Sequence, residues 1–319
     1  MYKYLFLLLL ITSCKTQSSL LSDPVEVAFV PQHEMTSIPG TTVEFSMTLV
    51  PSGKTTIGNE IHSNEGPSFE ATVQSFWIGT HELTFDEYKV FRKKDLDLVP
   101  LALPDWDADA ISRPSPPYED PTFGMGENGF PAVSMTQLAA LQYCKWLSDK
   151  TGEFYRLPSE IEWEYACQAN AKVDYQADLN AYAWHYDNSM EKYQKVGMKT
   201  ANPWGIHDML GNVSEWTLDQ YADDGYQTLS ASTEENPWIR PTSLHPRTVR
   251  GGSWDDDKSQ SRCDCRIESS SEWKERDPQI PKSFWWNTDS PFVGFRLLKP
   301  VNPPSAEDQA AFWEMVLGG

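Results

Sequence analysis

The chain combines short stretches of strand-like patterning with a few stretches that have clear helix starts. Apolar and polar residues alternate along 43–59, on both sides of a Pro-Ser-Gly turn, and again along 69–79, which predicts β-strands. Three later stretches begin with a hydroxyl residue followed three positions on by a carboxylate or amide, the reciprocal capping pattern of helices: Thr84 with Glu87, Ser134 with Gln137 and Ser159 with Glu162. Gly152 marks the end of the middle helix. The pattern predicts an α+β fold with much irregular chain.

The N-terminus has the pattern of an export signal. The apolar run Leu5–Ile11 is far shorter than the roughly 20 residues of a membrane-spanning helix. The four residues that end at Cys14 resemble a bacterial lipobox, which predicts a signal peptide over 1–13, a lipid on Cys14 and a tether over 14–42. An ordinary signal peptide cut elsewhere is the alternative. Because Lys15 is not the aspartate that retains lipoproteins in the inner membrane, we expect an outer-membrane location in the cell envelope, on either face.

Two long, polar, proline-containing stretches interrupt the pattern, at 93–120 and 219–248. Connections of this length are uncommon in compact domains, which indicates surface insertions that are functional or specific to a lineage. The tail 301–319 predicts a short terminal helix that begins at Ser305 and docks through Phe312, Trp313 and Val316.

Composition and charge narrow the classes of function. The 319 residues carry a net charge of −20 and include 13 Trp, 13 Tyr and 14 Phe, enough aromatic volume for a large core. An acidic surface repels nucleic acid and anionic lipid and suits calcium or basic partners. The six histidines form no pair with zinc-hydrolase spacing, and neither a nucleophile elbow nor a phosphate loop occurs. The run Asp255–Asp257 is typical of a solvated acidic loop.

Several ordered blocks carry a family resemblance. They include YRLPSEIEWEYAC at 155–167, NPWGIHDMLGNVSEW at 202–216, RGGSW at 250–254 and VGFRLLKP at 293–300. With further blocks upstream, the chain resembles the formylglycine-generating-enzyme, or sulfatase-modifying-factor, family over 43–300. The resemblance implies an α+β fold with little regular secondary structure, related at its centre to C-type lectins. Together with the lipobox, it resembles lipoproteins of the gliding and secretion machinery of Bacteroidetes.

The block HDMLGNVSE suggests a calcium site. Calcium takes six to eight oxygen ligands and accepts a mixture of carboxylates and backbone carbonyls. The resemblance implies that the side chains of Asp208 and Glu215 bind calcium together with the carbonyl oxygens of Gly211 and Val213. The alternative is a capped turn with a solvated acidic pair.

The resemblance also locates the positions of a copper centre. In the resembling enzymes, two cysteines hold copper(I), and they lie two and seven residues beyond the aromatic residue that follows G-G-S. Counted from Trp254, these positions are Asp256 and Ser261, whose hard oxygen atoms do not replace two thiolates. Ser214 likewise replaces a tryptophan of the family's active cleft. We therefore expect no catalytic residues and no copper.

Cys263 and Cys265 lie near these positions, and two uses of their thiols are open. Residues two apart on a strand point the same way, so a slipped register would bring both sulfur atoms to one copper ion. Arg262 and Arg266 fit the family's R-x-x-x-R spacing without a gap, which argues against slippage. The resemblance instead implies a disulfide from Cys167 to Cys265 or Cys263, which an exported chain permits.

These features predict a lipid-anchored, exported domain of this family that acts as a binding or scaffold module for an outer-membrane or periplasmic protein partner. No nucleic-acid partner is expected. The alternative is an enzyme, either a sulfatase-modifying oxidoreductase that converts cysteine to formylglycine with displaced thiols, or a tailoring oxidase of the same fold. The replacement of the copper cysteines by Asp256 and Ser261 places the binding module first.

Overall fold

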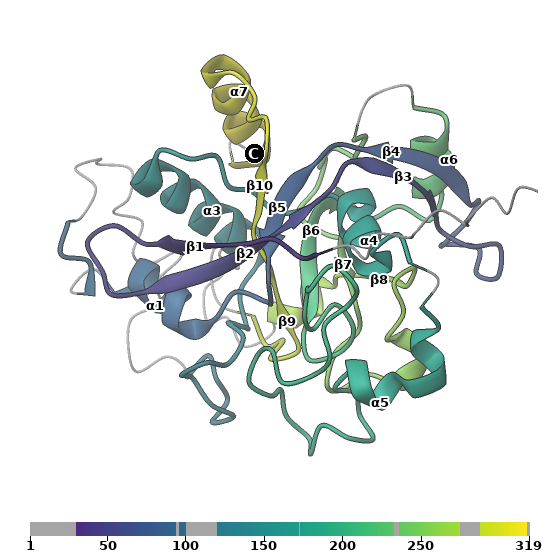
Figure 1. Cartoon of the computed structure of the whole chain (residues 1–319), viewed down its shortest axis with the longest axis horizontal. Helices are drawn as coiled ribbons and strands as arrows, with labels where there is room; N and C mark the ends of the chain where they lie inside the picture. Colours follow the sequence, from purple (N-terminus) through teal and green to yellow (C-terminus); the bar gives the residue numbers. More distant parts are fainter. Residues whose placement is uncertain are drawn as a thin grey trace, which may run out of the picture.

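The structure is a computed structural model that describes residues 30–93, 96–99, 120–171, 173–232, 236–274 and 288–317. Within this part of the chain, helices pack around three β-sheets (Figure 1). The first sheet is antiparallel throughout and has the order β1-β2-β5-β10. Its strands are β1 His33–Ser37, β2 Glu44–Val50, β5 Phe76–Gly79 and β10 Leu298–Pro300. The beginning and the end of the domain therefore meet in one sheet.

The other two sheets differ in size and burial. The hairpin pairs β3 (Gly53–Ile57) with β4 (Phe69–Val73). The third sheet has the order β8-β7-β6-β9, in which β9 runs parallel to β6. Its strands are β6 Ser214–Gln220, β7 Arg247–Arg250, β8 Arg266–Glu268 and β9 Val293–Gly294. Every residue of β6 and β7 is buried, so this sheet lies in the interior.

The described helices are few and mostly short. The α-helices are α1 Phe85–Arg92, α3 Gln137–Thr151, α4 Glu160–Gln168, α5 Leu179–Tyr182, α6 Gly225–Ser230 and α7 Ala306–Leu317. Single 3-10 turns occur at Tyr175–Asp178, Lys258–Gln260 and Ser271–Lys274. This mixture confirms the predicted α+β class.

Local capping explains where the main helices begin. Thr84 and Ser159 form reciprocal capping boxes at α1 and α4, as the sequence predicts. The prediction for α3 is wrong by two residues: its cap is Thr136, whose side chain accepts a hydrogen bond from the amide of Ala139. Ser134 has a φ of 62°, outside the extended region that a capping residue adopts. Gly152 ends α3 in the left-handed conformation.

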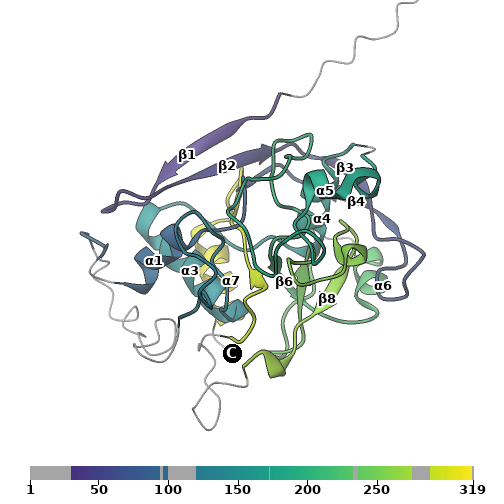
Figure 2. The ribbon, with the colours of Figure 1, turned by 90° about the horizontal axis from the view of Figure 1, so that it is seen from below.

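Two hydrophobic cores flank the third sheet. The first contains mutually contacting rings from α1, α3 and the chain before β10, with centroids 5.4 to 6.1 Å apart: Tyr88, Phe91, Tyr143, Trp146 and Phe295. The second surrounds α4 and includes Trp163, Tyr165 and Tyr226. Figure 2 shows α1, α3 and α7 on one side of β6 and α4, α5 and α6 on the other.

The boundaries of the domain differ from the expected ones at the N-terminal side. The expected tether, 14–42, contains β1, which pairs with β2 along its whole length. The domain therefore begins about ten residues before 43, because β1 supplies the edge of the first sheet. The expected signal peptide 1–13, the expected lipidation site Cys14 and most of the expected insertion 93–120 lie outside the described residues. Among the described helices, none is long and apolar enough to cross a membrane.

Candidate functional site

The residues expected to bind calcium lie in one buried loop that leads into β6: Asp208, Gly211, Val213 and Glu215. The backbone turns tightly here, since φ is 54° at Asp208, 70° at Gly211 and 56° at Asn212. A Cβ atom on Gly211 would lie 2.1 Å from the carbonyl oxygen of Trp184. The position therefore requires glycine, which lets the loop pack against the chain at Trp184.

Glu215 is already engaged by protein donors. Arg296 donates from Nη2 to Oε1 at 2.5 Å and from Nε to Oε2 at 2.6 Å, and the indole of Trp163 donates to Oε2 at 2.7 Å. The same guanidinium donates to the carbonyl oxygens of His207 and Asp208. A cation in this loop would therefore share Glu215 with Arg296.

A third carboxyl group, Glu82, completes the site and was missed at the level of sequence. Glu82 Oε2 and Asp208 Oδ1 are buried oxygen atoms with no hydrogen-bond partner. Burial raises the pKa of Glu82 well above its ordinary value, and the charges of Asp208 and Glu215 raise it further. Burial likewise raises the pKa of Asp208. Three carboxyl groups thus lie around one guanidinium, that of Arg296. If all three were ionised, their charge would exceed that of the guanidinium, so protons or a bound cation must offset the difference.

These atoms fit a calcium ion in part. The two unpartnered oxygen atoms are hard acceptors of the kind that calcium takes, although a proton shared between Glu82 and Asp208 satisfies them equally well. Within the described ranges, side chains alone form no group of three His, Cys, Asp or Glu residues that would hold a metal. Backbone oxygen atoms would therefore have to complete the coordination. The available signal for Glu82 was a single acidic residue inside the aromatic-rich stretch FWIGTHELTF.

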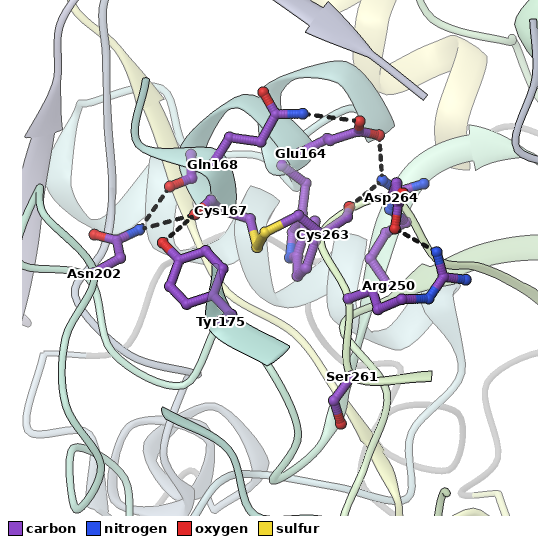
Figure 3. The surroundings of a disulfide bond; sticks show 12 residues. Glu164, Cys167, Gln168, Tyr175, Asn202, Arg250, Ser261, Cys263 and Asp264 are labelled. Carbon is purple, nitrogen blue, oxygen red and sulfur yellow. Dashed lines mark hydrogen bonds and ion pairs between the residues drawn. A yellow bond between two sulfur atoms is a disulfide. The ribbon is translucent and has the colours of Figure 1, made fainter. Parts of the chain in front are cut away.

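A disulfide joins the end of α4 to the segment before β8. Its partners are Cys167 and Cys263, with Cα atoms 5.6 Å apart (Figure 3). The pairing with Cys265 is wrong, and Cys265 is a buried free thiol. The reason is local: Arg262 to Cys265 form a turn, closed by the amide of Cys265 on the carbonyl of Arg262, and β8 begins only at Arg266. The same-side alternation of a strand therefore does not apply.

A cavity of about 300 Å³ lies beside this disulfide. Its walls come from the turn before β4, the end of α4, the 3-10 turn before α5 and the disulfide segment; they include Gly58, Gln168, Tyr175, Gln176, Leu210, Arg262, Cys263 and Asp264. The Tyr175 hydroxyl donates to the carbonyl of Cys167 at 3.1 Å, and Asn202 donates to the same peptide region (Figure 3). Among its described lining residues there is no histidine and no free thiol.

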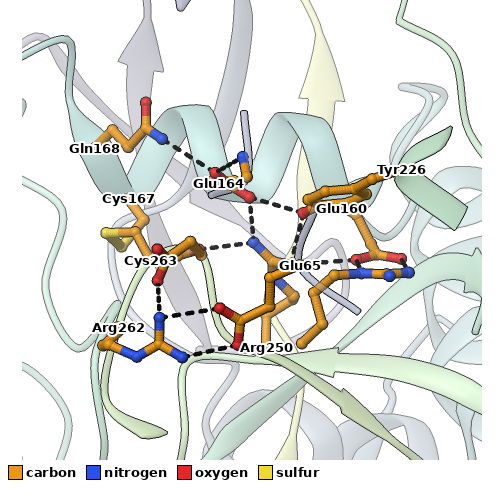
Figure 4. Close-up of polar contacts among 12 residues, drawn as sticks. Glu65, Glu160, Glu164, Cys167, Gln168, Tyr226, Arg250, Arg262 and Cys263 are labelled. Atoms are coloured by element: carbon orange, nitrogen blue, oxygen red, sulfur yellow. Dashed lines mark hydrogen bonds and ion pairs between the residues drawn. A yellow bond between two sulfur atoms is a disulfide. The ribbon is translucent and has the colours of Figure 1, made fainter. Parts of the chain in front are cut away.

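Ion pairs fix the wall of this cavity in place. Arg262 Nη2 lies 2.7 Å from Glu65 Oε1 (Figure 4). Arg262 Nη1 lies 2.6 Å from Asp264 Oδ1. Behind them, Arg250 donates to Glu164 Oε2 at 2.6 Å and to the carbonyl oxygen of Cys263 at 2.6 Å. The cavity is therefore preformed, and its cationic group is already neutralised.

The copper positions hold oxygen atoms with separate partners. Asp256 accepts a hydrogen bond from the Ser253 hydroxyl at 2.7 Å, and burial raises the pKa of Asp256. Ser261 is fully buried, its carbonyl accepts from Gln176 at 2.9 Å, and its hydroxyl has no partner in the described structure. The sulfur of Cys263 is in the disulfide. Burial raises the pKa of Cys265 to about 11, so its thiol stays protonated at neutral pH.

Comparisons with known proteins place this geometry in a family. The chain is 27% identical over 252 residues to the serine/threonine-protein kinase pkn1 of Chlamydia caviae, an alignment covering 77% of this chain and 39% of the kinase. It is 24% identical over 276 residues to the formylglycine-generating enzyme of Bos taurus, covering 70% of each. The solved structure of Treponema denticola variable protein 1 shares the fold, with a TM-score of 0.62, 20% identity, and coverage of 85% of this chain and 100% of that one.

The family itself is shown by a match over most of the chain. The sulfatase-modifying factor enzyme 1-like domain matches residues 33–299, from β1 to β10. This range agrees with the sheet that joins the two ends of the domain. The chain therefore belongs to the family of sulfatase-modifying factor enzyme 1-like domains, which includes the formylglycine-generating enzymes.

Proposed function

We propose that this chain is a binding module of the formylglycine-generating-enzyme fold rather than a copper oxidase. The observation that carries the proposal is the state of the sulfur atoms near the copper positions. Asp256 and Ser261 offer oxygen, and Cys263 is bonded to Cys167. A copper(I) site needs two thiolates at one point, and soft ligands are required because oxygen does not stabilise copper(I).

The free thiols of the described chain do not supply such a site. They are Cys144 and Cys265, both buried. Cys144 lies in the aromatic core on α3, and burial raises its pKa far above the ordinary thiol value. A protonated thiol is a poor metal ligand and a poor nucleophile. The sulfatase-modifying oxidoreductase and the tailoring oxidase are therefore the less favoured alternatives.

The cavity beside the disulfide supports binding of a ligand or a partner segment. At about 300 Å³ it is at the small end of ligand-sized pockets, and its ion-paired wall is rigid. In this proposal, calcium binds the unpartnered oxygen atoms of Glu82 and Asp208, shares Glu215 with Arg296, and takes the carbonyls of Gly211 and Val213. Its charge offsets the excess of buried carboxyl groups over Arg296. The metal acts as a structural ion.

An assay for conversion of cysteine to formylglycine in a sulfatase-type peptide tests this proposal. With copper(I) and oxygen supplied, mass spectrometry is expected to show no aldehyde product from the wild-type chain. A double variant, Asp256→Cys with Ser261→Cys, places cysteines at the two copper positions. It tests whether the rest of the scaffold supports turnover once those cysteines are present. Turnover by the wild-type chain that disappears in Cys265→Ser would contradict the proposal of a binding module. It would show instead that Cys265 takes part in a copper centre displaced from the family positions.

We further propose that Cys14 carries a lipid that holds the domain at the outer membrane, where it acts on a protein partner such as a component of a gliding or secretion machinery. The support is the sequence around Cys14, with Lys15 after it. In membrane fractionation, Cys14→Ser is expected to move the protein to the soluble periplasmic fraction, whereas Ser13→Ala leaves it in the membrane. Retention of Cys14→Ser in the membrane would contradict the lipid anchor.

A further inference from the structure

A second cavity, separate from the site above, lies where the C-terminal helix meets the segment that precedes β7. The expected surface insertion 219–248 is wrong at both ends, because Asp219 and Gln220 belong to the buried strand β6 and Arg247 and Thr248 to the buried strand β7. It has a volume of about 180 Å³ and is bounded by the start of α3, the segment before β7 and the last turn of α7. Apolar walls come from Leu138, Leu244, Met315 and Val316. The family match ends at 299, so α7 lies outside the shared domain. The cavity is therefore bounded in part by a helix that lies outside the matched family domain.

One wall of this cavity is a buried arginine with almost no partners. Arg247 is 6% exposed, and its Nη1 has no hydrogen-bond partner. Within the described structure, its guanidinium makes one hydrogen bond, from Nε to the carbonyl oxygen of Ser243 at 2.8 Å, and no ion pair. Burial lowers the pKa of Arg247 to about 10, so the group remains charged at neutral pH. A buried, uncompensated cation is costly in a protein interior.

The surroundings do not relieve this charge. His245 lies close enough that the positive charges of Lys274 and Arg247 lower its pKa, after the larger effect of burial. The chain as a whole has a net charge of −20, yet none of its many carboxylates forms an ion pair with Arg247 in the described structure.

The walls of the cavity are held in shape before any ligand binds. Gln220, at the end of β6, accepts hydrogen bonds from the amides of Thr242 and Ser243 at 3.1 Å each and donates to the carbonyl of Pro246. This clamp fixes the segment that carries Arg247. On the other side, α7 is fixed by Trp313, whose ring meets Phe154 at 5.7 Å. A preorganised pocket loses little entropy when it binds.

We propose that this cavity binds a carboxylate that carries a small apolar tail. The guanidinium of Arg247 lines the cavity with its Nη1 unpartnered, and a carboxylate is the partner that guanidinium groups favour. The walls formed by Leu138, Leu244 and Val316 take the apolar tail. A volume of about 180 Å³ has room for one branched side chain and its carboxylate. The ligand is either a small free acid or the C-terminal carboxylate of a peptide that ends in an apolar residue.

Isothermal titration of the purified chain tests this site with four probes. These are 4-methylpentanoate, its neutral amide, and a pentapeptide ending in leucine with either a free or an amidated C-terminus. Binding of the small acid and of the free peptide is expected, with no detectable binding of either amide. Binding of the small acid alone assigns the site to free acids, and binding that is much tighter for the peptide assigns it to chain termini.

Two variants connect the binding to Arg247. Arg247→Gln is expected to weaken carboxylate binding roughly 10- to 100-fold, the range for a lost charge-assisted hydrogen bond. Because that variant changes a buried group, Met315→Glu provides a second test at a half-exposed position, 40% exposed. Its carboxylate lies at the mouth of the cavity and is expected to abolish binding, whereas the matched neutral control Met315→Gln retains it.

The proposal is overturned by equal binding of acid and amide, by unchanged affinity in Arg247→Gln, or by the absence of any carboxylate-dependent heat from the folded wild-type chain. Inorganic phosphate that binds as tightly as 4-methylpentanoate would also overturn it, because the apolar walls would then play no part. The copper and formylglycine assays do not involve this cavity, so the two proposals fail independently.

Discussion

Strand β7 has a buried arginine at each end, and the two arginines have opposite electrostatic surroundings. Arg250 donates to Glu160, Glu164 and Tyr226, and although burial opposes its charge, Tyr226 and Glu164 raise its pKa above the ordinary value. Among the residues that the structure describes, Arg247 has only a carbonyl partner, and burial lowers its pKa. The paired arginine ties β7 to α4 inside the shared domain. The unpaired one faces a cavity bounded by α7, which lies outside that domain, and there a ligand rather than a carboxylate of the chain is needed.

The largest effect is expected from Arg250→Met. This change leaves Glu160 and Glu164 buried with fewer counter-charges, and breaking such a network costs about 3–5 kcal/mol of unfolding free energy. Urea unfolding followed by circular dichroism measures it. The matched double variant Arg250→Met with Glu164→Gln should recover part of the loss. A loss below 1 kcal/mol in Arg250→Met would contradict the structural role.

Removal of the disulfide should follow in size. The double variant Cys167→Ala with Cys263→Ala removes a cross-link between residues 96 positions apart in the sequence. Loss of a native disulfide lowers the unfolding free energy by roughly 2–5 kcal/mol. The control is Cys265→Ala, which loses only packing, about 1 kcal/mol. Non-reducing peptide mapping identifies the partners directly. A cross-link between Cys167 and Cys265 in the mapped peptides would contradict the pairing described above.

Calcium should stabilise the domain more strongly at alkaline than at acidic pH. Glu82 has a raised pKa in the folded state, so the stability that its proton supplies is present at low pH and is lost as pH rises above the unfolded value. Calcium replaces that proton and offsets the loss. At a calcium concentration about a hundredfold above Kd, binding adds about 2.7 kcal/mol.

Thermal unfolding with calcium or with EDTA, at pH 5 and pH 8, measures this difference. Glu82→Gln is the matched variant, because its amide keeps the acceptor for Asn212 and removes the titrating group. In that variant the pH dependence of the EDTA curves should flatten. Equal melting temperatures with and without calcium at both pH values would contradict calcium binding.

The smallest effect on folding is expected from Arg247→Met, which sharpens the contrast with Arg250→Met. The methionine removes a buried, unpaired charge and keeps most of the side-chain volume, so the unfolding free energy should change by less than about 1 kcal/mol or increase. The same urea experiment measures both variants. A loss of several kcal/mol from Arg247→Met would show that its charge is part of the fold and not reserved for a ligand.

Local signals in the sequence were sufficient where short-range chemistry decides the structure. The capping boxes at Thr84 and Ser159 need only four residues each, and the structure contains both. The cap near Ser134 was misplaced because tertiary contacts force a left-handed backbone there and move the helix start to Thr136. The sequence could not decide between Cys263 and Cys265 as the disulfide partner for a related reason. The pairing depends on the turn from Arg262 to Cys265, which a strand-like spacing does not predict.

Features built from distant segments were beyond the sequence patterns. Glu82 lies well over a hundred residues before the Asp208 loop, and a single carboxylate in an aromatic-rich stretch gives no sign of the partners it meets. The cavity at Arg247 is likewise invisible, because it needs the clamp by Gln220 and the last turn of α7 at Met315 and Val316. The resemblance predicted the fold correctly, because the family match covers the chain from β1 to β10.

Copper(I) titration of the purified chain, with the disulfide intact and a chromogenic chelator in competition, tests the central claim most directly. With Asp256 and Ser261 at the copper positions and Cys263 bonded to Cys167, we predict that the chelator keeps the copper and that no one-to-one complex forms. A tight one-to-one complex that disappears in Cys265→Ser would contradict the account and show that a copper centre persists on displaced sulfur ligands.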